Sequence, residues 1–145
     1  MRLKRSAAVA LAVAWAVTSA PARPADADAG QRTVINGSCQ YGARVARHHE
    51  DTLLILCDTA TIDRSAQGAT FDFAQRDWGS MASFSGAMTG DKMAVSQITL
   101  RHRGAVAATG TCELFHRSDG SLAVVSCLGK AGVRWVAVNF VPSRL

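Results

Sequence analysis

The stretch from Cys112 to Cys127 reads CELFHRSDGSLAVVSC, with Asp119-Gly120 between two mainly apolar runs. An Asp-Gly pair favours a two-residue turn between antiparallel strands. A turn on these two residues places Ser118 opposite Ser121 and, counting outward, Cys112 opposite Cys127. The sequence therefore predicts a β-hairpin closed by a disulfide bond. In this register the cysteines form a hydrogen-bonded pair, for which a Cα separation of about 5.5 Å is expected.

Cys39 and Cys57 are the other two cysteines of the chain. The sequence GSCQY around Cys39 resembles GTCEL around Cys112, and each is followed by an apolar strand that ends in cysteine. Four cysteines allow three pairings, but this analogy favours a first hairpin with a Cys39–Cys57 bridge. Each bridge would stabilise the fold by about 3 kcal/mol in the chain-entropy description. The sequence has no C-x-x-C spacing, which is typical of zinc and redox sites.

The first 22 residues have the pattern of a cleavable secretory signal peptide of bacterial type. A basic start precedes an apolar run over residues 7–17, and small residues follow it. Cleavage is expected after Ala22, with Ala27 and Ala29 as alternatives. The apolar run is shorter than the roughly 20 residues that cross a bilayer, so no transmembrane segment is expected in the mature chain. Export and an even number of cysteines predict a periplasmic or secreted protein.

The remaining chain divides into a flexible lead-in over residues 23–32, rich in Ala and Asp, and a single domain over residues 33–145. With 48% apolar and 19% charged residues, the composition is that of a globular protein. Loss of the signal's three basic residues lowers the formal charge from +5 to +2. The remaining arginines are dispersed among acidic residues, so no nucleic-acid partner is expected.

Short alternating runs separated by Gly, Asp and Ser predict strands throughout the domain. Phe71 and Phe73 alternate with polar residues and should face a core. The apolar phase changes between Val95 and Ile98, which predicts a β-bulge near residues 96–97. The last run is apolar on both faces, so we expect a strand that is central in the sheet or covered on both sides, with Trp135 in the core. The expected strands are residues 34–41, 52–58, 60–63, 69–75, 80–88, 92–101, 105–116, 121–128 and 133–141.

These strands predict an all-β fold, an antiparallel meander of about eight strands that forms a small barrel or a sandwich, stapled by two disulfides. A barrel is the preferred form because closing the sheet removes exposed strand edges.

Large and charged side chains at two expected turns are the candidate partner-binding residues. Arg76 and Trp78 belong to one turn, and Arg101, His102 and Arg103 belong to another. Loop residues placed by a rigid scaffold often carry binding functions.

The cluster His48-His49-Glu50-Asp51 contains metal-binding residue types, but it lies between the strands of the expected first hairpin. We therefore interpret it as a solvated loop and expect no metal site and no cofactor.

The sequence lacks the G-x-S-x-G, S-x-x-K, H-E-x-x-H and G-x-x-x-x-G-K motifs of common enzyme classes. The leading interpretation is a non-enzymatic binding module for a protein or small ligand outside the cytoplasm, of undefined oligomeric state. In size, export and disulfide use, the chain resembles small bacterial inhibitors of proteases and lysozymes, a resemblance that implies an inhibitor-like role. One alternative is a small hydrolytic or acid–base enzyme that combines His102 or His116 with Asp72 or Asp77. Another is a structural envelope protein.

Overall fold

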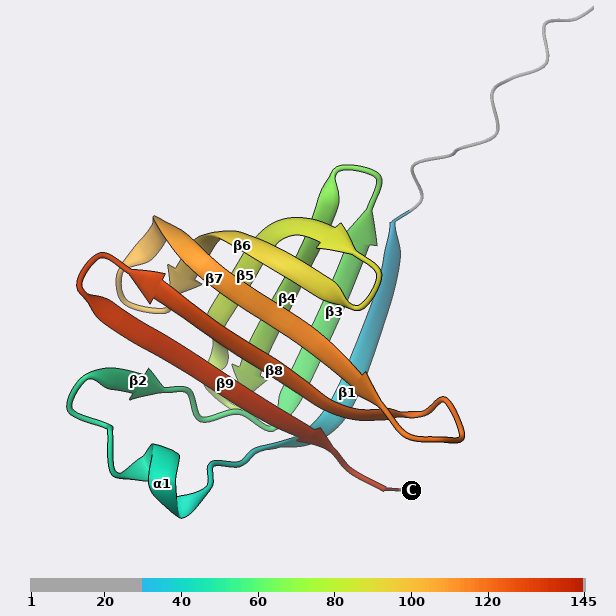
Figure 1. Cartoon of the computed structure of the whole chain (residues 1–145), viewed down its shortest axis with the longest axis horizontal. Coiled ribbons are helices and arrows are strands. Elements are labelled where there is room, and N and C mark those ends of the chain that lie inside the picture. The colour runs from blue at the N-terminus through green and yellow to red at the C-terminus, as the bar shows by residue number, and fades with distance from the viewer. Residues whose placement is uncertain (1–29, 145) are drawn as a thin grey trace, which may run out of the picture.

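The computed structural model describes residues 30–144, which form an all-β domain (Figure 1). The expected signal peptide and most of the lead-in lie outside the described residues. Strand pairing begins at Gln31, two residues before the expected start of the domain. The strands are β1 (Gln31–Cys39), β2 (Thr52–Leu54), β3 (Thr59–Ser65), β4 (Gly68–Gln75), β5 (Gly79–Thr89), β6 (Lys92–Leu100), β7 (Gly104–His116), β8 (Leu122–Ala131) and β9 (Arg134–Pro142), and the short helix is α1 (Ala43–Ala46).

Eight of the strands form a closed antiparallel barrel. From β3 to β9, each strand pairs with the next one in the chain, and β1 closes the sheet by pairing with both β3 and β9. The meander and the preferred barrel form are therefore confirmed. Strand β9 also pairs in parallel with β2, so it has three neighbouring strands and is central in the sheet, one of the two arrangements expected for the last strand. Its outer face is not covered, because Trp135 on that face is 39% exposed.

The hairpin of β7 and β8 pairs Cys112 with Cys127, as predicted, but its turn differs from the expected one. Arg117 N–H donates to the carbonyl of Ser121 at 2.8 Å, which leaves a three-residue loop with Gly120 at a positive φ of 83°. A bulge in β8 then restores the predicted register. The cysteine Cα atoms lie 4.0 Å apart, closer to the spacing of a non-hydrogen-bonded pair than to the expected 5.5 Å.

The Cys39–Cys57 bridge is present, but the expected hairpin around it is not. Strand β1 pairs with β3 and β9, while β2 pairs with β9 alone. The segment between the cysteines contains α1 and leaves the barrel before β2 returns to it (Figure 1). The local analogy identified the right partners because the chain returns to the end of β1 at Cys57, where Cys39 N–H donates to the Cys57 carbonyl at 2.8 Å.

The barrel interior is filled by aromatic side chains. Phe71, Phe73, Phe84 and Phe140 are fully buried, and the ring centroids of Phe73 and Phe84 lie 6.0 Å apart in an edge-to-face arrangement. The inward orientation of Phe71 and Phe73 is as predicted. Trp135 is 39% exposed, so its expected place in the core is wrong. The inward-facing residues of β9 are Val136, Val138 and Phe140, and Trp135, one residue out of phase with them, points to the outer face of the barrel.

The predicted bulge in β6 is confirmed. Ser85 pairs with Gln97 while Gly86 pairs with Val95, so Ser96 is the extra residue. This extra residue puts Val95 and Ile98 on the same inner face, and both are buried.

Candidate functional site

A large cavity opens at one end of the barrel, and we call it the barrel-mouth pocket. Its volume is about 1010 Å³. Three segments surround it: the residues from β2 into the connection to β3, the β6–β7 turn and the β8–β9 turn, which lie on the left of Figure 1. Its lining comprises residues 53–56, 101–103 and 131–134 together with Met81, Leu100, Val106, Ala107 and Val136.

The lining of the pocket is mainly apolar, and its charged side chains are basic. Its charged or titratable side chains are Arg101, His102, Arg103 and Arg134, and none of its lining residues is acidic. The buried Val136 belongs to both the pocket lining and the core. Because the phenylalanines fill the barrel interior, the pocket is a recess at the barrel end.

One wall of the pocket, residues 53–56, is held against β9 by several polar contacts. The Tyr41 hydroxyl oxygen lies 2.5 Å from the Ile55 carbonyl oxygen and 3.0 Å from the Ala137 carbonyl oxygen, and its single proton is shared between these two acceptors. Ile55 N–H also donates to the Ala137 carbonyl, and the disulfide between Cys57 and Cys39 follows directly. Burial raises the pKa of Tyr41 to about 12, so the phenol remains a donor at neutral pH.

Arg101 connects the pocket rim to the β4–β5 turn. Its guanidinium carbon lies 5.1 Å from the centroid of the Trp78 ring, and its Nη1 donates to the Trp78 carbonyl. The same nitrogen lies 3.8 Å from Met81 Sδ. Two turns that are 23 residues apart in the sequence are thereby joined at the barrel mouth.

The structure brings most of the five predicted binding residues to this end of the barrel. Arg101, His102 and Arg103 line the pocket, and Trp78 adjoins it through Arg101. Arg76 lies on the same turn as Trp78 but does not line the pocket.

The main chain of Arg76 has a structural contact. Its N–H donates to Asp58 Oδ2 at 2.9 Å, and this hydrogen bond holds the pKa of the Asp58 carboxyl below its usual value. The contact ties the β4–β5 turn to the β2–β3 connection.

The sequence pattern does not reveal the apolar wall of the pocket or part of its rim. The run LLIL at residues 53–56 is predicted to belong to a hairpin strand, but its lack of alternation indicates that it is not a strand with one buried and one exposed face. The last strand is predicted to begin at Val133, but Val133 is 97% exposed in the turn and β9 begins one residue later, at Arg134.

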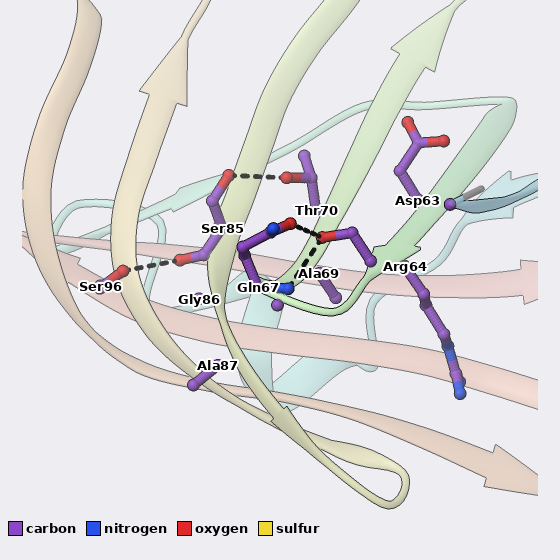
Figure 2. A pocket seen from close by; sticks show the side chains of 12 residues that line it. Asp63, Arg64, Gln67, Ala69, Thr70, Ser85, Gly86, Ala87 and Ser96 are labelled. Carbon is purple, nitrogen blue, oxygen red and sulfur yellow. Dashed lines mark hydrogen bonds between the residues drawn. The ribbon is translucent and has the colours of Figure 1, made fainter. Parts of the chain in front are cut away.

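A second groove of about 560 Å³ lies near the β3–β4 turn and is lined mainly by small and hydroxyl side chains (Figure 2). Its polar groups largely satisfy one another. Ser65 Oγ donates to Gln67 Oε1 at 3.1 Å, Thr70 and Ser85 hydroxyls lie 3.1 Å apart, and Ser96 Oγ donates to the Ser85 carbonyl at 3.3 Å.

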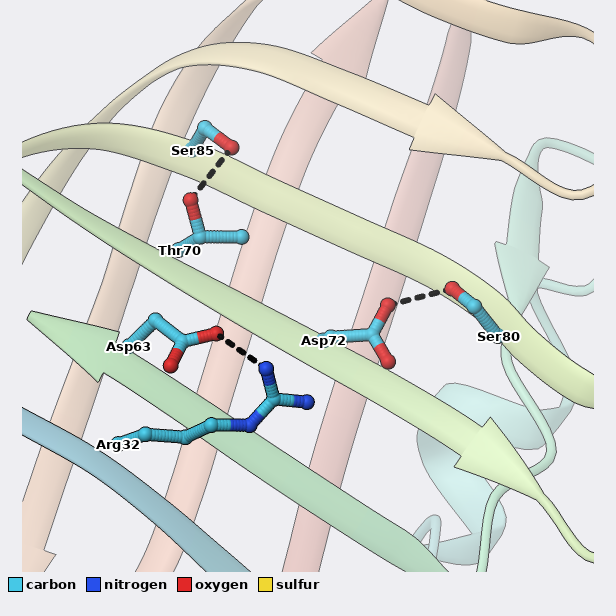
Figure 3. A network of polar contacts seen from close by, with 6 residues as sticks. All are labelled: Arg32, Asp63, Thr70, Asp72, Ser80 and Ser85. Carbon is cyan, nitrogen blue, oxygen red and sulfur yellow. Dashed lines mark hydrogen bonds and ion pairs between the residues drawn. The ribbon is translucent and has the colours of Figure 1, made fainter.

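The outer face of β1, β3, β4 and β5 carries a related set of polar contacts (Figure 3). Arg32 and Asp63 form an ion pair at 3.8 Å, and the Ser80 hydroxyl donates to the Asp72 carboxylate. These contacts join neighbouring strands. In them the Asp72 carboxylate accepts a hydrogen bond from Ser80.

The carboxylate that contacts His116 is not one of the two proposed for the enzyme alternative. His116 Nδ1 lies 3.5 Å from Asp91 Oδ2, at the other end of the barrel from the pocket. Within residues 30–144, the His102 side chain has no hydrogen bond or ion pair, so the structure does not form the expected combinations with Asp72 or Asp77.

The cluster His48-His49-Glu50-Asp51 is exposed and lies between α1 and β2, in a connection as expected but not in a hairpin. His49 Nδ1 lies 3.1 Å from the Ala46 carbonyl. In the described part of the chain, no three His, Cys, Asp or Glu residues are grouped closely enough to hold a metal ion.

Comparisons with known protein families, with curated proteins and with solved structures found no match to this chain. None of the helices in residues 30–144 has the length and apolar character to span a membrane. The two disulfides are typical of proteins that fold in an oxidising compartment outside the cytoplasm.

Proposed function

We propose that this protein is a non-enzymatic binding module of the periplasm or external medium, and that it holds its ligand in the barrel-mouth pocket. The observation that carries the proposal is the apolar cavity of about 1010 Å³ at one end of a filled barrel. Ligand sites are commonly concave, largely apolar and found at the mouths of β-barrels.

Contacts that hold the pocket walls in place support binding. The Tyr41 hydroxyl joins the 53–56 wall to β9, and the Cys39–Cys57 bridge anchors the end of that wall to β1. Arg101 contacts Met81 within the lining and Trp78 beside it. A preformed pocket loses little conformational freedom when a ligand enters, which favours affinity.

Binding can be tested with the neutral fluorescent probe N-phenylnaphthylamine and the protein purified after export. We expect saturable enhancement of probe fluorescence by the wild-type protein. Ala131→Trp should abolish it, because Ala131 lines the pocket. The matched control is Thr111→Trp, which places the same ring on the exposed outer face of β7. Absence of saturable binding by the folded wild-type protein would contradict the proposed function.

The proposed location rests on the N-terminal sequence together with the disulfides. We expect the native protein from the periplasm or medium to begin at Arg23, with start points after Ala27 or Ala29 as the alternatives, and to contain no free thiol. Intact mass measurement with and without reduction tests both points. A native chain that begins at Met1 and carries four reduced thiols would contradict export.

A further inference from the structure

The rim of the barrel-mouth pocket is positively charged while its interior is apolar. This combination fits a ligand that has one apolar end and one negatively charged end. The apolar end would cover side chains of the 53–56 wall that line the pocket, among them the half-buried Leu53 and Leu54 and Leu56, which is 61% exposed. Covering such side chains is favourable because it removes apolar surface from water.

The arginines of the rim are not equivalent. Arg101 is engaged by Trp78 and Met81. By contrast, the guanidinium groups of Arg103 and Arg134 make no side-chain hydrogen bond or ion pair with any residue of the described chain. Both guanidinium groups can therefore donate hydrogen bonds to a ligand.

The backbone presents these two arginines at the pocket edge. Arg103 precedes Gly104, which has a φ of 68°, and Arg134 follows the β8–β9 turn, where Gly132 has a φ of 64°. Such left-handed positions are readily adopted by glycine and make tight turns. The two turns thus carry one free guanidinium each to the rim of the same cavity.

We propose that the barrel-mouth pocket binds a single-chain anionic amphiphile, a straight-chain fatty acid carboxylate, with its chain in the pocket and its head at Arg103 and Arg134. This inference rests on the proposed function and specifies its ligand. Guanidinium groups match the planar carboxylate and can bind it through two parallel hydrogen bonds. The absence of acidic side chains from the lining removes the main source of repulsion.

The test is calorimetric titration of the exported protein with octanoate, decanoate and dodecanoate, all below their micelle concentrations. Each added methylene that enters the pocket should tighten binding by roughly fourfold. Decanol, which has the same chain as decanoate without the charge, should bind about tenfold more weakly or worse. The variant R103Q/R134Q should lose this preference for the acid over the alcohol.

The matched control is R44Q/R47Q, which removes the same number of charges from the exposed α1 region outside the pocket. It should retain the preference. Urea unfolding of both double variants establishes that they are folded; if R103Q/R134Q does not fold, the single variants R103Q and R134Q replace it.

The outcomes separate the ligand class from the proposed function. Equal binding of decanoate and decanol, with saturable N-phenylnaphthylamine binding, would overturn the anionic ligand and leave the binding module standing. Failure of probe, acid and alcohol alike would overturn both. If the protein instead sediments with phosphatidylglycerol vesicles and monomeric decanoate does not compete, the occupant is a membrane surface and the fatty acid proposal is wrong.

Discussion

Arg101 stacks on the ring of Trp78 at 5.1 Å, and through this contact the β6–β7 turn is joined to the β4–β5 turn. Trp78 is 60% exposed, so the pair is accessible to solvent. Exposed cation–π pairs contribute about 0.5–1 kcal/mol. The contribution of the pair to the free energy of unfolding is therefore expected to be small.

A double-mutant cycle tests this relationship. For wild type, Trp78→Leu, Arg101→Gln and the double variant, urea unfolding should give a coupling free energy of about 0.5–1 kcal/mol. Each single variant should remain folded, because the aromatic core is untouched. Additive effects of the two substitutions would show that the stacking seen in the structure contributes no stability.

The two disulfides should differ in their effect on the pocket. Replacing either pair by alanine should lower the free energy of unfolding by about 3 kcal/mol, measured by urea denaturation. Loss of Cys39–Cys57 should also weaken N-phenylnaphthylamine binding, because Cys57 follows the pocket wall directly. Loss of Cys112–Cys127 should leave probe binding by the folded fraction unchanged, since neither residue lines the pocket. The reverse pattern would rule out the assigned role of the Cys39–Cys57 bridge.

Tyr41 should make the protein sensitive to alkali. Its pKa is about 12 in the folded chain against a usual 10, so between these values the unfolded chain is ionised while the folded chain is not. The stabilising contribution is therefore complete below pH 10 and is lost as the pH rises through 12.

Because Tyr41 is the single tyrosine of the sequence, tyrosinate absorbance reports its ionisation without interference from another tyrosine. We expect the absorbance of the native protein to rise near pH 12. In Tyr41→Phe, the free energy of unfolding should fall by about 1 kcal/mol at neutral pH and should vary less between pH 10 and 12. Titration of the native protein near pH 10 would contradict burial of the phenol.

The absence of a side chain at Gly129 leaves space for the core side chain of Ile98. Gly129 is buried in β8, and a Cβ at this position would lie 2.6 Å from Ile98 Cδ1 and 3.5 Å from a Phe84 ring carbon. Gly129→Ala should therefore destabilise the barrel by about 1–3 kcal/mol through overpacking. Thermal or urea unfolding measures the loss.

Ile98→Val removes the methyl group that the new Cβ would meet. Alone it should cost about 0.5–1.5 kcal/mol, but G129A/I98V should be more stable than the sum of the single effects implies. Strict additivity would mean that another contact limits the size of residue 129.

The sequence predicted the features that depend on neighbouring parts of the chain. The pairing of Cys112 with Cys127, the inward phenylalanines of β4 and the bulge at Ser96 all follow from alternation and turn chemistry within one or two strands. Even there, the three-residue loop and the bulge in β8 escaped prediction. Their offsets cancel in the register, so the cysteine pairing was right although the turn was wrong.

The candidate site was predicted only in part. The turn residues Arg101, His102 and Arg103 were recognisable as exposed and charged, but Trp135 was placed in the core because apolar character does not reveal which face of a doubly apolar strand points inward. The run at residues 53–56 could not be placed, since its partner β9 follows roughly 80 residues later.

The sequence by itself determined the strands from β3 to β9, their consecutive pairing and the Cys112–Cys127 partners, because these arise from alternation and turns along the chain. Tertiary structure alone decided that β1 closes the sheet onto β9, that β2 lies parallel to β9 and that three separate segments surround one cavity. The physical reason is that a pocket forms where distant segments converge, and this convergence depends on how the whole barrel closes.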